Sequence, residues 1–272
     1  MPELEVPGAC LHYEIHGKGP LFLCISGGTG SLEIYSQLAQ HLKQHFTVAI
    51  YDRRGFSRSV LVGSQDYEHR LETDADDVAL LIRHLSPDKP AFVLGNSSGA
   101  IVALEALIRH SDVVDKVLVQ EPPLISVLPD FRAVQEHIQR VHQIYRKNGV
   151  APAMEQFAAM TKSGAETAAL LAAFDPKVGG PYTSGNVMYW LEREFLPYPT
   201  NEIDMEALKK YTDKLMLLNC EGTHREALHY RANVVLAEKL DLDLEIMPGG
   251  HVGFAYMPEP WARRLVEIVI GS

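Results

Sequence analysis

Residues 90–104, Pro90-Ala-Phe-Val-Leu-Gly95-Asn-Ser97-Ser-Gly99-Ala-Ile-Val-Ala-Leu104, join a short apolar run to a longer segment with helical spacing. The apolar run ends at Gly95, and after Gly99 the apolar residues recur at helical intervals. This change of period predicts a buried strand that leads directly into a helix. The turn between them reads Gly95-x-Ser97-x-Gly99, and its glycines are small enough to let strand and helix approach closely.

Ser97 stands at the centre of this turn, where a serine is held in a strained backbone conformation with its hydroxyl exposed above the sheet. The helix N-terminus beside it favours developing negative charge. The motif alone is short and recurs by chance, so its position between strand and helix is the stronger observation. Ser97 is therefore the candidate nucleophile. The alternative is an ordinary turn in which Asn96 or Ser98 only caps the helix.

On both sides of this stretch, strand patterns alternate with helix patterns. The expected strands are 4–6, 11–16, 21–25, 46–51, 91–94, 113–120, 215–219 and 242–247, and the expected helices include 32–44, 71–85, 225–240 and 261–270. Such alternation predicts an α/β fold with a mostly parallel central sheet that helices cover on both faces.

The alternation stops between residues 124 and 213, where helical patterns dominate and 131–147 and 151–161 are the clearest. We interpret this segment as a helical cap over the carboxyl edge of the sheet, the edge where open α/β sheets bind ligands. Residues 1–123 and 214–272 would then form the α/β core.

The composition narrows the partners and the compartment. The 272 residues carry a formal net charge of −10, which is unsuited to generic binding of nucleic acids or anionic membranes. No apolar run reaches the length of a membrane span, and the first residues lack the features of a secretion signal. Cys10, Cys24 and Cys220 are expected to be reduced thiols. We therefore expect a cytoplasmic protein with a small-molecule substrate. A homodimer is compatible with the sequence, which does not give the oligomeric state.

A serine nucleophile needs a general base, and His251 is the best placed of the 12 histidines. It lies in the glycine-rich loop 247–254, directly after the last expected strand, and so at the same sheet edge as Ser97. His224 and His229 are five residues apart in an expected helix and would point to different faces. We therefore expect no metal site, and the chemistry requires no cofactor.

Two glutamates compete for the role of the acid that orients the base. Glu121 and Glu221 each follow an expected strand at this edge, and Asp213 is a more remote alternative. Pro122 should hold Glu121 in an extended conformation, with its carboxylate at the sheet edge. We favour Glu121, which would fix the tautomer of His251 and stabilise its imidazolium form.

Two backbone N–H groups should hold the oxyanion that forms when Ser97 attacks a carbonyl group. One is expected from Ser98, and the other from the loop 26–30, Ser-Gly-Gly-Thr-Gly, with Gly28 preferred over Thr29. Read as a dinucleotide fingerprint, this loop fails because Glu33 stands where the third glycine belongs. The arginine-rich segment 52–59 is interpreted as a loop that its own charges hold in place.

Together these motifs resemble those of the α/β-hydrolase superfamily over nearly the whole chain. The resemblance rests on Ser26-Gly27-Gly28, Asp52-x-Arg54-Gly55-x-x-x-Ser59, the turn at Ser97, and Gly250-His251. Gln120-Glu121-Pro122-Pro123 is similar to the Glu-Pro-Pro motif of small capped serine hydrolases whose acid follows strand six. Two features depart from the superfamily pattern. Ser26 replaces the usual histidine before the oxyanion glycine, and Asn219-Cys-Glu-Gly-Thr replaces the usual aspartate loop after strand seven.

The resemblance implies a serine hydrolase that cleaves a carboxylic ester, lactone or thioester through an acyl-enzyme. Hydrolysis of a carbon–carbon bond in a diketone-type substrate would use the same triad, and a ligand-binding protein with little turnover would retain it. The expected cap contributes aromatic and methionine side chains that favour an apolar substrate. They are Phe157, Met188, Tyr189, Trp190 and Phe195.

Overall fold

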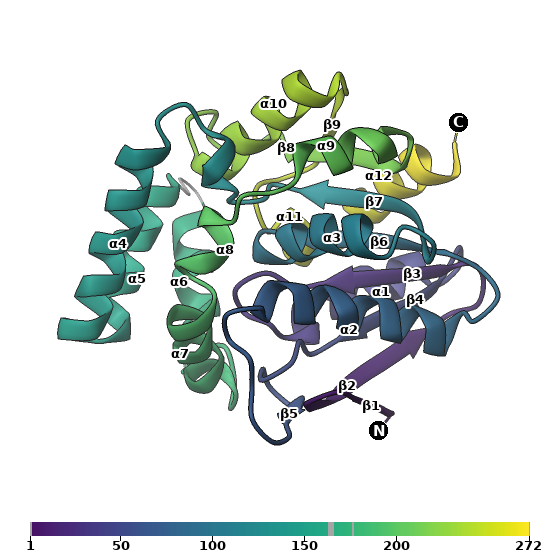
Figure 1. The fold of residues 1–272 in the computed structure, drawn as a ribbon, viewed down its shortest axis with the longest axis horizontal. Coiled ribbons are helices and arrows are strands. Elements are labelled where there is room, and N and C mark those ends of the chain that lie inside the picture. The colour runs from purple at the N-terminus through teal and green to yellow at the C-terminus, as the bar shows by residue number, and fades with distance from the viewer. Residues whose placement is uncertain (1, 163–165, 176, 272) are drawn as a thin grey trace.

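The computed structural model describes residues 2–162, 166–175 and 177–271. Within these residues a nine-stranded sheet has the order β1-β2-β4-β3-β6-β7-β8-β9, with β5 beside β2 (Figure 1). All neighbouring strands from β4 through β9 pair in parallel, whereas β2 pairs antiparallel with β1, β4 and β5. The strands are β1 (Glu3–Val6), β2 (Ala9–His16), β3 (Leu21–Ile25), β4 (Thr47–Tyr51), β5 (Val60–Leu61), β6 (Ala91–Asn96), β7 (Val114–Gln120), β8 (Leu215–Cys220) and β9 (Leu244–Met247). The expected α/β fold is confirmed.

The central strand β3 shows why this sheet is covered on both faces. All of its residues are buried, and successive side chains of a strand point to opposite faces. Leu21, Leu23 and Ile25 belong to one hydrophobic cluster, and Phe22 and Cys24 belong to a second. A strand with two buried faces therefore reads as a continuous apolar run.

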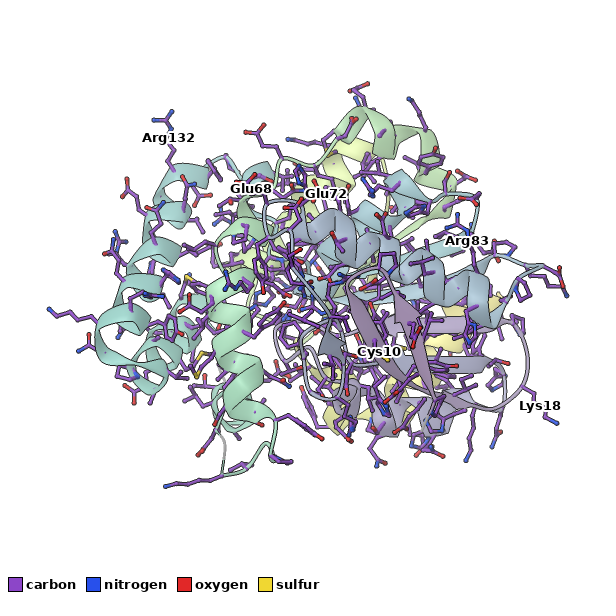
Figure 2. The ribbon with its side chains drawn as sticks, turned by 60° about the horizontal axis from the view of Figure 1, so that its bottom comes forward. Cys10, Lys18, Glu68, Glu72, Arg83 and Arg132 are labelled. Carbon is purple, nitrogen blue, oxygen red and sulfur yellow. The ribbon has the colours of Figure 1, made fainter. Side chains whose placement is uncertain are left out.

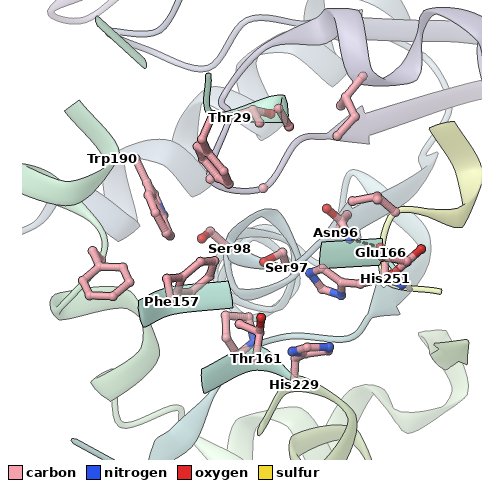
Figure 3. A pocket seen from close by; sticks show the side chains of 18 of the residues that line it. Thr29, Asn96, Ser97, Ser98, Phe157, Thr161, Glu166, Trp190, His229 and His251 are labelled. Atoms are coloured by element: carbon pink, nitrogen blue, oxygen red, sulfur yellow. Dashed lines mark hydrogen bonds between the residues drawn. The ribbon is translucent and has the colours of Figure 1, made fainter. Parts of the chain in front are cut away.

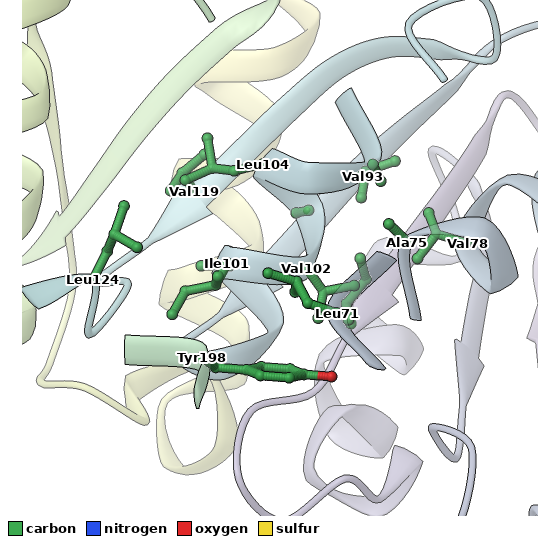
Figure 4. Close-up of a cluster of buried hydrophobic side chains, with 14 of the residues drawn as sticks. Leu71, Ala75, Val78, Val93, Ile101, Val102, Leu104, Val119, Leu124 and Tyr198 are labelled. Atoms are coloured by element: carbon green, nitrogen blue, oxygen red, sulfur yellow. The ribbon is translucent and has the colours of Figure 1, made fainter. Parts of the chain in front are cut away.

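Helices α2, α3 and α10 pack in the first cluster, and α1 and α12 pack in the second. In the first cluster, Ile101, Val102 and Leu104 of α3 lie among side chains of the sheet and of α2 (Figure 4). The helices of the core are η1 (Leu32–Tyr35), α1 (Ser36–Leu42), α2 (Arg70–Leu85), α3 (Ser98–Arg109), α10 (Leu228–Leu240), α11 (Gly253–Tyr256) and α12 (Pro258–Ile270).

The segment after β7 is helical, and α4 to α7 gather beside the end of the sheet where the parallel strands finish (Figure 1). Its elements are η2 (Ile125–Val127), α4 (Phe131–Asn148), α5 (Val150–Thr161), α6 (Thr167–Ala173), α7 (Thr183–Arg193), α8 (Pro197–Thr200), α9 (Met205–Leu208) and η4 (Lys209–Lys214).

Three local expectations need correction. The helix expected over 32–44 is divided into η1 and α1, and Ser31 caps η1 by accepting a hydrogen bond from the Glu33 N–H. The strand β5 was not predicted, because a strand of two residues is too short to show a periodic pattern. Helix α10 begins at Leu228, so His224 lies in the preceding loop and not on the helix with His229.

Exposed charged side chains such as Lys18, Arg83 and Arg132 point away from the ribbon (Figure 2). Cys10, Cys24 and Cys220 are free thiols, as expected. Among the described helices, none is both long enough and apolar enough to cross a membrane.

Candidate active site

The turn between β6 and α3 has the strained geometry expected for Ser97. Its backbone adopts φ +54° and ψ −124°, a region that residues other than glycine rarely occupy. A Cβ at Gly95 would lie 2.3 Å from the Gly99 oxygen, and one at Gly99 would lie 2.3 Å from the Ile25 oxygen. Both positions therefore require glycine, and the sharp turn presents Ser97 at the carboxyl edge of the sheet.

Glu121 and His251 meet at this edge. The Glu121 carboxylate is fully buried, and its Oε2 lies 2.8 Å from His251 Nδ1. The carboxylate also accepts hydrogen bonds from the Cys220 backbone N–H at 2.9 Å and from the Thr223 hydroxyl at 3.1 Å. A carboxylate at Nδ1 favours the tautomer with the proton on Nδ1, which leaves Nε2 of His251 free to accept a proton.

The backbone of Glu121 differs from the expected extended conformation, because its φ is +46°. A following proline disfavours the right-handed α region for its predecessor, but it does not fix the sign of φ. The side chain nevertheless stays at the sheet edge, where the Cys220 and Thr223 donors bind it.

The alternative acids lie elsewhere. Glu221 is exposed, and its carboxylate contacts the Gly249 N–H at 3.3 Å. Asp213 lies in η4, before β8 and so at the opposite end of that strand from Cys220. The structure therefore brings Glu121, but neither alternative, against His251.

The backbone of His251 is held from several directions. Its N–H donates to Glu166 Oε2 at 2.7 Å, and its carbonyl oxygen accepts hydrogen bonds from Asn96 Nδ2 at 3.2 Å and Gln120 Nε2 at 3.1 Å. Sequence reasoning missed all three partners. Asn96 and Gln120 could have been predicted to lie at the site, because each is a polar residue at the end of a buried apolar strand. No feature of the sequence indicates Glu166.

Ser97 and His251 line one cavity of about 260 Å³ between the sheet edge and the helical segment (Figure 3). No hydrogen bond joins the Ser97 hydroxyl to another described residue, His251 included, so the expected direct contact is not formed. Such contacts are often long in enzymes without substrate and shorten when substrate binds.

Aromatic side chains form the wall of the cavity opposite His251 (Figure 3). The Trp190 ring packs edge-to-face against Phe157 and Phe195, with ring centroids 5.2 and 4.9 Å away. These three were among the expected cap residues. The other two lie outside the lining, because the Tyr189 ring packs on Phe56 and the Met188 side chain is half exposed.

The loop 26–30 lies between the nucleophile and this aromatic wall. A Cβ at Gly27 would come within 2.8 Å of Ser97 Cβ, and one at Gly28 would come within 2.7 Å of Trp190 Cε2. The backbone N–H groups of Gly28 and Ser98 donate to no other residue that the structure describes. Both groups are therefore free to bind a ligand oxygen.

Arg53 fixes this loop from behind. Its buried guanidinium donates to the Gly27 oxygen at 3.0 Å, to Asp74 at 3.0 Å, and to both oxygens of Glu194, just after α7. Burial alone would lower the pKa of Arg53, but the Glu194 and Asp74 carboxylates outweigh it and raise that pKa. The other two arginines of segment 52–59 are also paired with carboxylates, Arg54 with Asp77 and Arg58 with Asp52. Only the Arg58–Asp52 pair lies within the segment, so the expectation that the loop is held by its own charges is met only in part.

A second histidine stands beside the first. The buried His229 ring lies 4.2 Å from the His251 ring, and its Nε2 is 3.8 Å from Glu121 Oε2. Burial, and then the neighbouring His251, lowers the pKa of His229 well below its usual value. Glu121, His229 and His251 offer ligand atoms within 4.8 Å of one another, an arrangement that the sequence had not indicated. Because Glu121 and His251 already bond to each other, the absence of a metal stays our expectation.

These features define an α/β-hydrolase: a parallel sheet whose strand–turn–helix presents a serine at the edge that carries a buried acid and a histidine. The family model for the alpha/beta hydrolase fold matches residues 20–177. Over 271 residues the chain is 31% identical to the uncharacterized hydrolase YraK of Bacillus subtilis, covering 98% of this chain and 94% of that protein. The chain therefore belongs to the α/β-hydrolase family, and it is an enzyme of the hydrolase class. The narrower resemblance based on Glu-Pro-Pro stays a prediction.

Two further proteins are similar over most of the chain. The zearalenone hydrolase of Bionectria ochroleuca is 24% identical over 265 residues, covering 96% of this chain and 94% of that protein. A thermophilic esterase from Thermogutta terrifontis superposes with a TM-score of 0.76 at 18% identity, covering 99% of this chain and 98% of the other. At this identity the second comparison shows the fold alone.

Proposed function

We propose that the protein is a serine hydrolase that cleaves a carboxylic ester, lactone or thioester of a small apolar substrate. Ser97 is the nucleophile, His251 the general base, and Glu121 the acid that orients it. The observation that carries this proposal is the 2.8 Å contact between Glu121 and the Nδ1 of a histidine that shares a cavity with the strained Ser97. Residues 124–213 act as a cap that supplies the apolar wall of the cavity.

The reaction proceeds through an acyl-enzyme. His251 Nε2 takes the hydroxyl proton as Ser97 Oγ attacks the carbonyl carbon, and the backbone N–H groups of Ser98 and Gly28 bind the oxyanion. The intermediate collapses as His251 returns the proton to the leaving alcohol or thiol. A water molecule, deprotonated by His251, then attacks the acyl group and releases the acid. In the structure no hydrogen bond joins the Ser97 hydroxyl to the described atoms of His251. Substrate binding must therefore bring the two side chains together before the first proton transfer.

Labelling with a fluorophosphonate probe tests the nucleophile. Wild type should react, and Ser97→Ala should not react at all. Glu121→Gln should react far more slowly, while Glu221→Gln should react at close to the wild-type rate, because Glu221 is exposed and its carboxylate binds the Gly249 N–H and not the His251 ring. Equal loss in both glutamate variants would contradict the assignment of the acid. An unlabelled but folded wild type would contradict the proposed nucleophile.

The bond that is cleaved is tested with p-nitrophenyl acyl esters of graded chain length, with lactones, and with diketones of similar size. We expect the esters to be turned over and the diketones to be resistant. Faster turnover of the diketones would favour carbon–carbon bond hydrolysis with the same three residues.

A further inference from the structure

The cavity has a charged lining residue that takes no part in the proposed triad. Among the described lining residues there is one carboxylate, Glu166, and no lysine or arginine. His229 also lines the cavity, but burial and His251 lower its pKa well below the usual value, so it is neutral near pH 7. A ligand in this cavity therefore meets apolar walls and one negative side chain.

Glu166 is fixed in position and is not a freely moving surface group. One carboxylate oxygen accepts the His251 N–H at 2.7 Å, and the other accepts the Tyr256 hydroxyl. The Tyr256 oxygen in turn accepts the Gly250 N–H at 2.8 Å. The carboxylate lies so close to the loop that a Cβ at Gly250 would come within 2.3 Å of it.

All of these donors are neutral, and among the described residues no cation lies within ion-pair distance of Glu166. Burial, and then the Glu166 carboxylate beside it, raises the pKa of the Tyr256 hydroxyl to about 12, so this phenol remains a neutral donor. The negative charge of Glu166 is therefore compensated only by the dipoles of these neutral donors. Figure 3 shows Glu166 next to His251 and Asn96, with Trp190 and Phe157 across the cavity.

We propose that Glu166 is a specificity-determining residue that makes the enzyme select uncharged substrates over substrates that carry a carboxylate. The inference rests on the proposed function of the same cavity. A carboxylate that entered would lose its hydration without gaining a cation, and it would also be repelled by Glu166. The first effect comes from the whole lining, and the second from Glu166 alone.

The size of the second effect follows from the size of the cavity. A sphere of 260 Å³ is about 8 Å across, which sets the order of separation between Glu166 and a substrate carboxylate. Coulomb's law with an effective dielectric constant of about 20 then gives a discrimination of about 30-fold. The loss of hydration adds to this factor in wild type.

The test compares kcat/KM for p-nitrophenyl hexanoate with that for mono-p-nitrophenyl glutarate, an anionic ester of similar length. Wild type should prefer the neutral ester by well over 30-fold, and Glu166→Gln should reduce this ratio by about 30-fold. Glu238→Gln removes one negative charge from the exposed side of α10 and is the matched control for net charge. Tyr256→Phe weakens the anchoring of Glu166 without removing its charge. Neither control should change the ratio by more than about twofold, whatever it does to the rate.

A binding measurement makes the outcome independent of turnover. Ser97→Ala, with and without Glu166→Gln, is titrated with N-phenylhexanamide and with the monoanilide of glutaric acid. Preference for the neutral amide that weakens in the double variant supports the inference, even if every ester resists wild type and the proposed function fails. Equal binding of the two amides, failure of the neutral amide to bind, or a ratio unaffected by Glu166→Gln would overturn the inference while leaving the triad intact.

Discussion

His229 provides a stability prediction whose sign and size follow from its position in the structure. The side chain is buried, its ring lies 4.2 Å from the His251 ring, and its pKa is lowered well below its usual value. The folded protein therefore keeps this imidazole neutral, whereas the unfolded chain protonates it near pH 6.5. Glu121, 3.8 Å away, does not reverse the effect of burial.

Below pH 6.5 the unfolded chain binds more protons at this position than the folded protein does, so stability rises with pH in this range. The contribution of His229 is fully present above pH 6.5 and is lost as the pH falls toward the folded-state pKa. For an imidazole that stays neutral in the folded state, linkage between pH 7 and pH 5 amounts to about 2 kcal/mol. This is a substantial part of the stability of an ordinary domain.

The assay is reversible urea unfolding of wild type and His229→Gln at pH 7 and pH 5. Glutamine is neutral at both values, so the difference between the two proteins isolates His229 from all other groups that titrate. Wild type should lose about 2 kcal/mol more than the variant between the two pH values. The C2 proton of His229, followed by NMR, should show no titration near pH 6.5. An equal loss in both proteins, or a larger loss in the variant, would refute the reasoning.

Other predictions concern the triad, the loops and the buried ion pairs. Ser97→Ala should reduce kcat on p-nitrophenyl esters by at least about 10⁴-fold, and Glu121→Gln by about 10³–10⁴-fold, with Glu221→Gln as the control. Glu194→Gln should lower the free energy of urea unfolding by about 3 kcal/mol, because it leaves the buried charge of Arg53 only partly compensated. Glu206→Gln, which breaks an exposed pair with Lys209, should change it by less than about 1 kcal/mol, and equal effects would contradict this account. Gly99→Ala should cost about 1–3 kcal/mol or more, measured in the same way, because its Cβ would lie 2.3 Å from the Ile25 oxygen.

The parts of the fold that were predictable are those set by local rules. The run Leu21–Ile25 is apolar because both of its faces are buried, and it was recognised as a central strand from that feature alone. The turn at Ser97 was recognised because glycines two positions away on either side leave a signature in the sequence. His251 was selected from 12 histidines by its loop, since parallel strands bring their following loops to one edge.

The parts that were missed depend on how helices far along the chain pack against the carboxyl edge of the sheet. Glu166 reaches His251 across 85 positions of sequence, and its immediate neighbours carry no motif. His229 was assigned to a helix shared with His224, and its proximity to Glu121 follows from how α10 packs, which periodicity does not reveal. The acid was predicted to be Glu121, but Glu221 stayed an alternative because both glutamates follow strands at the same edge.

The contact between the Glu121 carboxylate and the Cys220 N–H has a consequence for how such enzymes diverge. This side-chain oxygen takes the place that a backbone carbonyl would have in extending the pairing of β7 with β8, which reaches Gln120 and Leu218. Replacing Glu121 by alanine would therefore leave two buried donors, the Cys220 N–H and the Thr223 hydroxyl, without their acceptor. An acid could migrate from the end of β7 to the end of β8 only through intermediates that preserve an acceptor at position 121, such as glutamine. The same constraint applies to any attempt to relocate the acid by design.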